Sequence, residues 1–222
     1  MILIFDLDDT LYSEESYAIS GYRAVSDYIS MTYGVQAIDS LGILLEALES
    51  GQREEAFQRL VASKELPNKA LNQCITVYRK HTPEIQLDVA ARRILTRYSD
   101  IHKYLVTDGN KIVQRNKVKA LKLDGIMERC FITHAYGLHA AKPSIYCFQK
   151  IKEIEGVDWA DLVYVGDDPR KDFVNLKPLG VTTVRVLTGR HAQINVTEKF
   201  DAGHRISSID ELVKVLELKY AK

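Results

Sequence analysis

The first ten residues limit what this chain can fold into more than any other stretch. Residues 1–5 read Met-Ile-Leu-Ile-Phe, an apolar run that is short and bounded by charge. Such a run is typical of a buried strand rather than a helix. Asp6, Asp8 and Asp9 follow it directly. Because the ligands of parallel sheets gather beyond the carboxyl ends of the strands, these acids indicate either a functional site or the acidic strand exit that many α/β proteins have.

Asp6 and Asp8 lie two positions apart, so both side chains leave the same side of the chain if it stays extended. Two neighbouring carboxylates repel each other, and a cation between them is therefore expected. Hard oxygen ligands suit Mg²⁺, so we expect Mg²⁺ as the cofactor.

The composition narrows the class of protein and its partners. At 222 residues the chain fits one large domain, or a core with a smaller insert. Its 30 basic and 30 acidic residues cancel, so no broad attraction to nucleic acid or to an anionic membrane is expected. Three cysteines without a CxxC pair indicate reduced thiols rather than disulfides or a zinc site. Since no signal-peptide pattern and no membrane-spanning apolar run is found, we expect a soluble, cytoplasmic protein.

Residues 13–85 are expected to form a helical bundle inserted after the first strand, because no strand is evident between residues 12 and 100. Tyr12 and Tyr17 are either half-buried core residues, as most tyrosines are, or part of a substrate pocket beside the first strand. The apolar spacing predicts helices over residues 14–33, 39–50, 52–63 and 68–81.

From residue 86 onward, strand and helix patterns alternate. Alternation at this spacing predicts an α/β fold, a parallel sheet with helices on both faces. The predicted strands cover residues 103–107, 130–133, 162–166 and 181–187. The predicted helices cover residues 87–98, 111–122, 143–155, 171–178 and 208–219, with Pro143 at the start of the third.

Polar residues suited to phosphoryl transfer stand where three of these strands end. A cation and a lysine can neutralise phosphate oxygens, a hydroxyl and free N–H groups can hold them, and an aspartate can attack phosphorus. Each piece alone has an ordinary interpretation, such as a turn with Asn110 capping the next helix, or a solvated flank for Lys142. The candidates are Asp6, Asp8, Asp9, Thr107, Asp108, Lys142, Asp167, Asp168 and Asp172.

In these motifs the chain resembles the haloacid dehalogenase (HAD) superfamily of hydrolases, in its phosphatase branch. Residues 6–10, Asp-Leu-Asp-Asp-Thr, match that family's DxDx(T/V) motif, and Thr107 after an apolar strand matches its second motif. Lys142 followed by Pro143 is similar to the third motif, and residues 166–172 fit the GDxxxxD form of the fourth. The resemblance covers essentially the whole chain. It implies a Rossmann-like core made of residues 1–12 and 86–222, and an all-helical cap made of residues 13–85.

The resemblance also implies roles for these residues. Asp6 would be the nucleophile that forms an aspartyl-phosphate, and Asp8 would be the general acid and base. For this role Asp8 should have a modestly raised pKa, which neighbouring carboxylates could supply. Thr107, with Asp108 beside it, and Lys142 would bind the phosphate. Mg²⁺ would be held by Asp6, the backbone carbonyl of Asp8 and Asp167, with Asp172 nearby, although Asp168 beside Asp167 leaves open which acid contacts the metal.

Three other functions remain open on this scaffold. A 2-haloacid dehalogenase uses the same nucleophile but needs neither the metal nor the second acid, so Asp8, Asp167 and Asp172 argue against it. A sugar phosphomutase differs mainly in the acceptor of the phosphoryl group, and a non-catalytic binding module for a phosphorylated ligand is the third alternative. A cap over the site favours a small phosphorylated metabolite, such as a sugar phosphate, a nucleoside monophosphate or a phosphoglycolate-like compound. The oligomeric state stays open.

Overall fold

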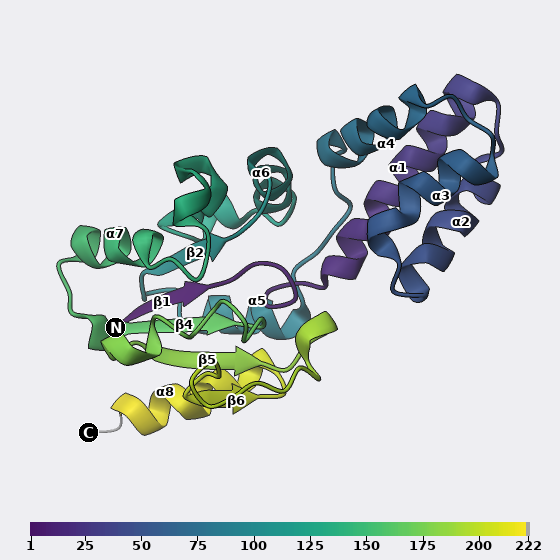
Figure 1. The fold of residues 1–222 in the computed structure, drawn as a ribbon. Helices are drawn as coiled ribbons and strands as arrows, with labels where there is room; N and C mark the ends of the chain where they lie inside the picture. Colours follow the sequence, from purple (N-terminus) through teal and green to yellow (C-terminus); the bar gives the residue numbers. More distant parts are fainter. Residues whose placement is uncertain (221–222) are drawn as a thin grey trace. The chain divides into compact units, whose positions relative to one another are not determined.

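The computed structural model describes residues 1–220 (Figure 1). The chain divides into two compact units. We call Met1–Glu14 together with the chain from Gln86 onward the sheet unit, and Glu15–Ile85 the helical unit. The first junction thus lies two residues beyond the boundary expected from the sequence, and the second coincides with it.

The sheet unit is built on six parallel strands with β1 (Ile2–Phe5) at its centre. The spatial order is β3-β2-β1-β4-β5-β6, and every paired neighbour runs parallel. This arrangement confirms the predicted α/β class with its parallel sheet. The other strands are β2 (Lys103–Thr107), β3 (Arg129–Ile132), β4 (Leu162–Gly166), β5 (Thr182–Val186) and β6 (His204–Ile206).

The central strand is apolar throughout because it is covered on both faces. Its four residues are buried, none more than 6% exposed. Ile2 and Ile4 belong to a cluster that includes Phe148 and Ile151 of α7 (Tyr146–Glu155). Since strand side chains alternate, the other residues of β1 face the opposite side of the sheet.

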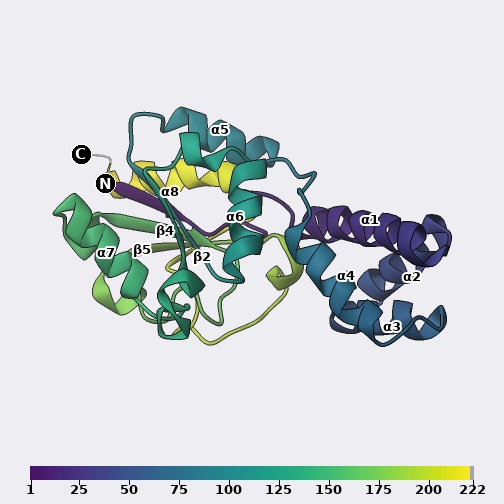
Figure 2. The ribbon, with the colours of Figure 1, turned by 90° about the horizontal axis from the view of Figure 1, so that it is seen from above.

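Three more helices complete the sheet unit. α5 (Val89–Arg97) and α8 (Leu212–Tyr220) run alongside each other (Figure 2), and Arg93 of α5 pairs with Asp210 just before α8. α6 (Lys111–Ala120) follows β2. Its first turn is capped by Asn110, whose side chain accepts hydrogen bonds from the backbone N–H groups of Ile112 and Val113, as the sequence indicated.

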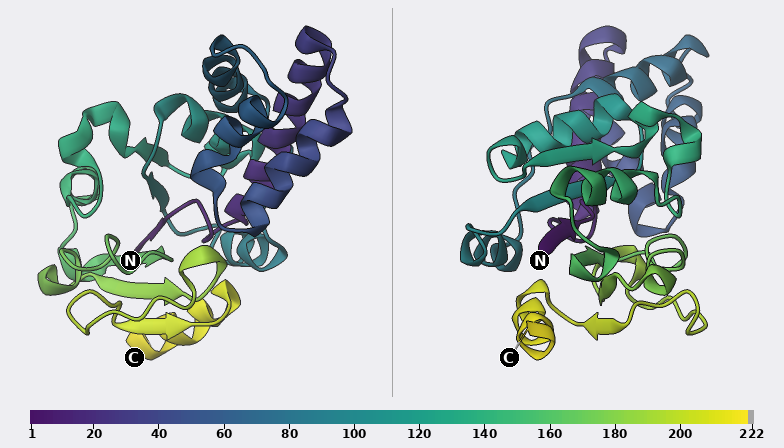
Figure 3. Two further views of the ribbon diagram at one scale, coloured as in Figure 1. Left: turned by 45° about the vertical axis from the view of Figure 1, so that its right-hand side comes forward. Right: turned by 90° about the vertical axis from the view of Figure 1, so that its left-hand side faces the viewer.

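The helical unit consists of helices (Figure 3). They pack around an aromatic and aliphatic core. Tyr17 is 2% exposed, and its ring meets the ring of Tyr78 edge-on with centroids 5.4 Å apart. The core interpretation therefore holds for Tyr17. The helices are α1 (Glu14–Tyr33), α2 (Ala37–Glu49), a 3₁₀ turn at Arg53–Glu55, α3 (Ala56–Ser63) and α4 (Lys69–Lys80).

The predicted helix over residues 171–178 is wrong, because this segment forms turns that end in a 3₁₀ turn at Lys177–Leu179. The Asp172 carboxylate accepts a hydrogen bond from the backbone N–H of Asp168 (2.9 Å), which folds the chain back on itself. Pro178 also lacks the N–H that a continuing helix would need. Phe173 and Leu176, three positions apart, are both buried, although their backbone is not helical.

Two other expectations change. The third helix of the sheet unit begins at Tyr146 rather than at Pro143, because a turn intervenes in which the Ser144 N–H donates to the Ala141 carbonyl (2.9 Å). β6 was not predicted, since it has only three residues and two of them are polar. Within residues 1–220, no helix combines the length and the apolar character needed to cross a membrane. The expected cytoplasmic location stays a prediction.

Candidate active site

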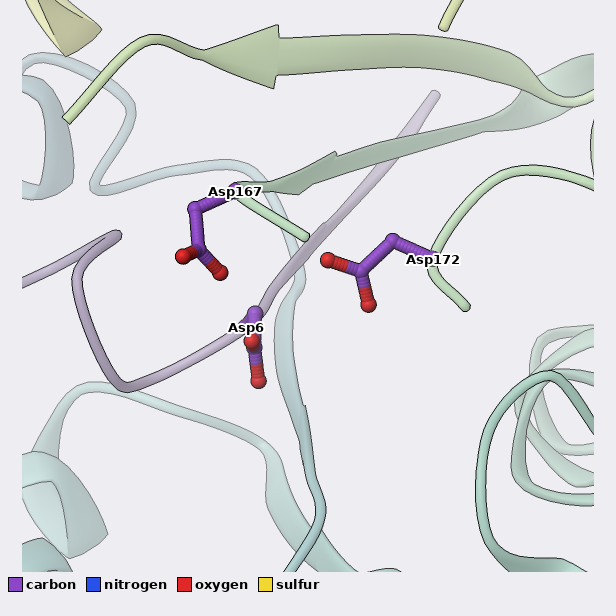
Figure 4. A group of neighbouring side chains, drawn as sticks. All are labelled: Asp6, Asp167 and Asp172. Carbon is purple, nitrogen blue, oxygen red and sulfur yellow. The ribbon is translucent and has the colours of Figure 1, made fainter. Parts of the chain in front are cut away.

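Three carboxylates meet at the carboxyl edge of the sheet (Figure 4). Asp6 follows β1, Asp167 follows β4, and Asp172 lies in the turn after it. β1 and β4 are neighbours, and the Asp6 N–H donates to the Val165 carbonyl (2.8 Å), so the two strand ends are held side by side. One oxygen from each carboxylate lies within 4.8 Å of the other two, and all three residues are buried. Buried carboxylates at this spacing need a cation.

Lys142 supplies one positive charge to this group. Its Nζ lies 3.0 Å from Asp6 Oδ1 and 2.7 Å from Asp172 Oδ1, and it donates to the Tyr164 hydroxyl (2.9 Å). The side chain is 1% exposed, so the interpretation of Lys142 as a solvated flank is wrong. Burial alone would lower the pKa of Lys142, but the carboxylates of Asp172 and Asp6 outweigh it and raise that pKa well above its ordinary value.

Lys142 compensates the negative charge of Asp6 only in part. Burial raises the pKa of Asp6 to about 7, Lys142 opposes that rise, and the carboxylate of Asp172 adds to it. A second cation beside Asp6 would favour its ionised form, which is the form that can attack phosphorus.

Asp8 faces a different set of partners. Its Oδ1 accepts from the Tyr12 hydroxyl (2.5 Å) and lies 2.6 Å from Lys117 Nζ, and its Oδ2 accepts from Gln114 Nε2 (2.9 Å). The expected raised pKa of Asp8 is therefore wrong for the protein without substrate. Burial pushes the pKa of Asp8 upward, but Lys117 and the three hydrogen bonds outweigh it and lower the pKa.

Gln114 and Lys117 were missed at the level of the sequence. The neighbouring charged residues Arg115, Lys119 and Lys122 are all exposed. Gln114 and Lys117 are three positions apart on the opposite, buried side of α6. A glutamine and a lysine in the apolar stripe of a helix were the available signal.

Thr107 and Asp108, at the end of β2, differ in what they contact. Thr107 is 1% exposed, and its hydroxyl oxygen accepts from Gln114 Nε2 (2.6 Å). Asp108 Oδ1 accepts from the Thr133 hydroxyl (2.6 Å) and from the Lys142 backbone N–H (3.1 Å). Asp108 thus fixes the segment that carries Lys142.

The two adjacent acids after β4, Asp167 and Asp168, have different partners. Asp167 Oδ2 lies 2.7 Å from His191 Nδ1, whereas Asp168 pairs with Arg170 through two bonds of 2.8 and 2.9 Å. Burial tends to raise the pKa of Asp168, but the hydrogen bonds from Arg170 dominate and lower it to about 2. Arg170 also donates to His191 Nε2 (2.8 Å), so His191 donates its Nδ1–H to Asp167. Within residues 1–220, the carboxylate group is therefore Asp6, Asp167 and Asp172.

Asp9 holds the loop that carries His191. Its carboxylate accepts from the backbone N–H groups of Glu14 (2.8 Å) and Arg190 (3.3 Å). Gly189 has φ +60°, and a Cβ there would lie 2.1 Å from Asp9 Cγ, so the loop can approach Asp9 this closely only with glycine. Nothing in the local sequence links residues 9 and 189, and this contact was not anticipated.

A cleft of about 310 Å³ lies beside these residues in the sheet unit. Its lining includes Asp6, Asp8, Thr107, Asp167 and Lys117. Lys142 and Asp172 are not part of this lining, and Lys142 is connected to it through the contact with Asp6. The cleft lies beyond the carboxyl ends of β1, β2 and β4, where parallel sheets form their sites. It combines a candidate nucleophile, a second acid, a buried lysine and a group of acids suited to a divalent cation.

The chain is similar along nearly its whole length to curated phosphatases. It shares 26% identity over 230 residues with the glyceraldehyde 3-phosphate phosphatase of Methanocaldococcus jannaschii, which covers 97% of this chain and 96% of that protein. It shares 27% identity over 224 residues with the enzyme of the same name from Pyrococcus furiosus, covering 97% and 92%. The prediction of a HAD-like phosphatase is confirmed at the level of enzyme class.

The fold is that of solved HAD structures. The putative HAD-hydrolase YfnB from Bacillus subtilis, whose crystal structure has bound magnesium, superimposes with a TM-score of 0.67 and 19% identity, covering 97% of each chain. A family model for haloacid dehalogenase-like hydrolases matches residues 1–180. The chain therefore belongs to the haloacid dehalogenase-like hydrolases.

Proposed function

We propose that this enzyme is a Mg²⁺-dependent phosphatase that hydrolyses a small phosphorylated metabolite through an aspartyl-phosphate on Asp6. The observation that carries the proposal is the meeting of Asp6, Asp167 and Asp172, with the buried ammonium group of Lys142 paired to Asp6 and Asp172. The group offers both a carboxylate nucleophile and the positive charge that a phosphate needs.

The three acids fit a hard divalent cation. Their oxygens approach within 4.8 Å of one another, and Lys142 compensates only part of their charge. Asp6 and Asp167 would hold Mg²⁺, with the backbone carbonyl of Asp8 and the carboxylate of Asp172 in support. When bound, Mg²⁺ would neutralise phosphate oxygens and orient the phosphoryl group toward Asp6.

The chain's own residues then carry two steps. In the first, an Asp6 oxygen bonds to phosphorus, the ester P–O bond breaks, and Asp8 gives a proton to the departing alkoxide. In the second, Asp8 takes a proton from water, the water oxygen bonds to phosphorus, and the bond to Asp6 breaks. The Asp8 carboxylate is suited to the second step as it stands, and a phosphate dianion close to Asp8 would raise its pKa for the first.

Thr107 and Lys142 would bind the phosphate. Lys142 is held between Asp6 and Asp172, so a phosphoryl group arriving at Asp6 meets its positive charge. The Thr107 hydroxyl accepts from Gln114 and keeps its own hydrogen for a phosphate oxygen. Asp108 would act indirectly, by fixing the Lys142 backbone.

For the substrate, the curated relatives give the first candidate. Both are named for glyceraldehyde 3-phosphate. A three-carbon phosphate is small enough for a cleft of about 310 Å³. We therefore propose glyceraldehyde 3-phosphate, or a metabolite of similar size, as the substrate.

The test is to trap the phosphoenzyme. Asp6→Asn and Asp8→Asn variants are mixed with 4-nitrophenyl phosphate, with Mg²⁺ or with EDTA, and analysed by intact-protein mass spectrometry. A phosphoryl adduct is expected on Asp8→Asn with Mg²⁺, because proton transfer is lost while the nucleophile remains. No adduct is expected on Asp6→Asn, or on either variant in EDTA.

An adduct on Asp6→Asn would move the nucleophile to another acid. Full turnover in EDTA would overturn the metal assignment and favour dehalogenase chemistry. Transfer of the phosphoryl group to a sugar phosphate instead of water would identify a phosphomutase.

A further inference from the structure

Two buried polar side chains of α6 contact the site but have no role in the steps above. Gln114 and Lys117 are 1% and 2% exposed. Long polar side chains are rarely buried this deeply unless they are paired. On the same helix Arg115 and Lys119 are exposed, so the depth of Gln114 and Lys117 is not a general property of α6.

Lys117 and Gln114 contact opposite oxygens of the Asp8 carboxylate. Lys117 Nζ lies 2.6 Å from Oδ1, and Gln114 Nε2 donates to Oδ2 over 2.9 Å. The Tyr12 hydroxyl makes a second bond to Oδ1. Both oxygens are bonded, so the carboxylate would lose a partner if it rotated about its Cβ–Cγ bond or moved toward the group of Asp6, Asp167 and Asp172.

Gln114 also connects Asp8 to the predicted phosphate-binding hydroxyl. An ionised carboxylate only accepts hydrogen bonds, so the Gln114 amide must turn its NH₂ group toward Asp8. The same nitrogen lies 2.6 Å from Thr107 Oγ1, and its second hydrogen is donated there. The Thr107 oxygen therefore accepts from Gln114, and its own hydrogen is directed elsewhere.

We propose that Gln114 and Lys117 are positioning residues, which hold Asp8 at the angle needed for proton transfer while Gln114 also aims the Thr107 hydroxyl at the phosphate. The inference rests on the proposed function, because it assigns helpers to a proton-transfer step of that mechanism. The inference goes beyond the proposed function because it makes one face of α6 orient both Asp8 and the phosphate-binding Thr107. Neither residue would touch the reacting atoms.

A positioning role can be told apart from a purely structural one by the leaving group. An activated phenol such as 4-nitrophenol departs with little help from an acid, whereas unsubstituted phenol, with a pKa near that of tyrosine, needs the proton. Misplacing Asp8 should therefore slow the transfer from phenyl phosphate much more than the transfer from 4-nitrophenyl phosphate. A loss of folded protein would slow both equally.

The experiment compares Lys117→Met and Gln114→Leu with Lys119→Met and Arg115→Leu, which alter exposed positions of the same helix. Each variant is mixed with 4-nitrophenyl phosphate or phenyl phosphate and Mg²⁺ in a quenched-flow device. The rate of transfer to Asp6 is measured from the phenol released in the first turnover. Fluorescence of the single tryptophan, Trp159, reports that each variant is folded.

For Lys117→Met and Gln114→Leu, the rate with phenyl phosphate should fall by about 10²-fold, the lower end of what general acid catalysis contributes, and the rate with 4-nitrophenyl phosphate by less than about tenfold. Gln114→Leu should in addition raise KM for both esters, because Thr107 loses its orientation. The two control variants should match the unaltered enzyme with both substrates.

Equal losses with both esters, or no loss with either, would overturn the positioning role. Should Lys117→Met fail to fold, Gln114→Leu decides the matter alone, since it replaces one uncharged side chain with another of similar size. Absence of Mg²⁺-dependent turnover by the unaltered protein, or of a phosphoryl adduct on Asp8→Asn, would instead count against the proposed function, so the two failures are distinguishable.

Discussion

The sheet unit and the helical unit bury different kinds of side chain. Among the described residues, the buried polar side chains of the helical unit are those of three serines, Ser20, Ser26 and Ser40, and its core is aliphatic and aromatic. The sheet unit buries charged residues, most of them beyond the carboxyl ends of its strands: Asp6, Asp9, Lys103, Lys117, Lys142, Asp167, Asp168, Asp172, Arg185 and Asp201.

This difference separates stability from chemistry within one chain. Removing an ion pair from water costs free energy that its own attraction barely offsets, whereas a packed apolar core is stabilising throughout. The sheet unit keeps most of its buried charges near the proposed site, and the described residues of the helical unit include no buried charge. Substitutions in the two units should therefore fail in different ways.

The largest effect is expected from Lys142→Met. The variant should lose about 10²–10³-fold in kcat, as when a charge-stabilising group is removed from an active site. The metal-free protein should also lose about 3–5 kcal/mol in free energy of unfolding, because Asp6 and Asp172 are left unpaired. Hydrolysis of 4-nitrophenyl phosphate with Mg²⁺ measures the first, and urea denaturation in EDTA measures the second.

Lys152→Met is the matched control, because the Lys152 ammonium group pairs with the 91%-exposed Asp158 at 3.7 Å. It should change neither activity nor stability noticeably. A Lys142→Met variant with normal stability would show that the site tolerates its unpaired acids, and the distinction between the two units would then fail.

A middle-sized effect is expected from Leu44→Ala in the helical unit. Leu44 is fully buried in the core of that unit, so the substitution should cost about 2–5 kcal/mol through lost burial and a cavity. Hydrogen exchange followed by mass spectrometry should show the loss in residues 15–85. Mg²⁺ affinity, measured by calorimetry, should stay the same because no acid of the site is touched.

Ile38→Ala on the same helix provides the comparison, since Ile38 is 70% exposed and should be nearly neutral. If Leu44→Ala lowered Mg²⁺ affinity tenfold or more, the two units would not be energetically separate.

The smallest effect concerns the exposed His102 of the sheet unit and its half-buried partner Glu155. His102 Nδ1 lies 2.9 Å from a Glu155 carboxylate oxygen, and this hydrogen bond and the nearby charge raise the pKa of His102 above 6.5. Because the folded-state pKa is raised, the pair stabilises the protein fully below about pH 6.5, the unfolded pKa, and loses that contribution as pH rises through the folded-state pKa.

His102→Gln should therefore lower Tm slightly at pH 6 and leave it unchanged at pH 9. Differential scanning calorimetry at the two pH values checks this, with the exposed His204→Gln as control. A larger loss at pH 9 than at pH 6 would contradict the assignment.

Much of the site was predictable because its geometry follows from a rule of parallel sheets. The end of an apolar run fixes where each strand stops, and neighbouring parallel strands stop at the same edge. Asp6 and Asp167 could therefore be placed together although 161 positions separate them, as their residue numbers show. The helical insert at residues 13–85 could also be predicted, since that stretch shows no strand pattern.

The predictions that failed concern segments in which tertiary contacts override the local sequence pattern, or in which that pattern is too short to read. Phe173 and Leu176 have helix-like spacing, but Asp172 is drawn back to Asp168, and the chain turns instead. β6 was invisible because three residues at a sheet edge carry almost no pattern.

By itself the sequence determined the class of fold, the positions where the main strands end and the acids that follow those ends. All of these depend on periodicity within short segments. The tertiary structure alone decided the state of those acids. Lys117 reaches Asp8 across 109 positions, Lys142 is buried rather than solvated, and Gly189 lies against Asp9. Since the pKa of a carboxyl group depends on the charges and hydrogen bonds within a few ångströms of it, such contacts set the chemistry of Asp8 and Asp6.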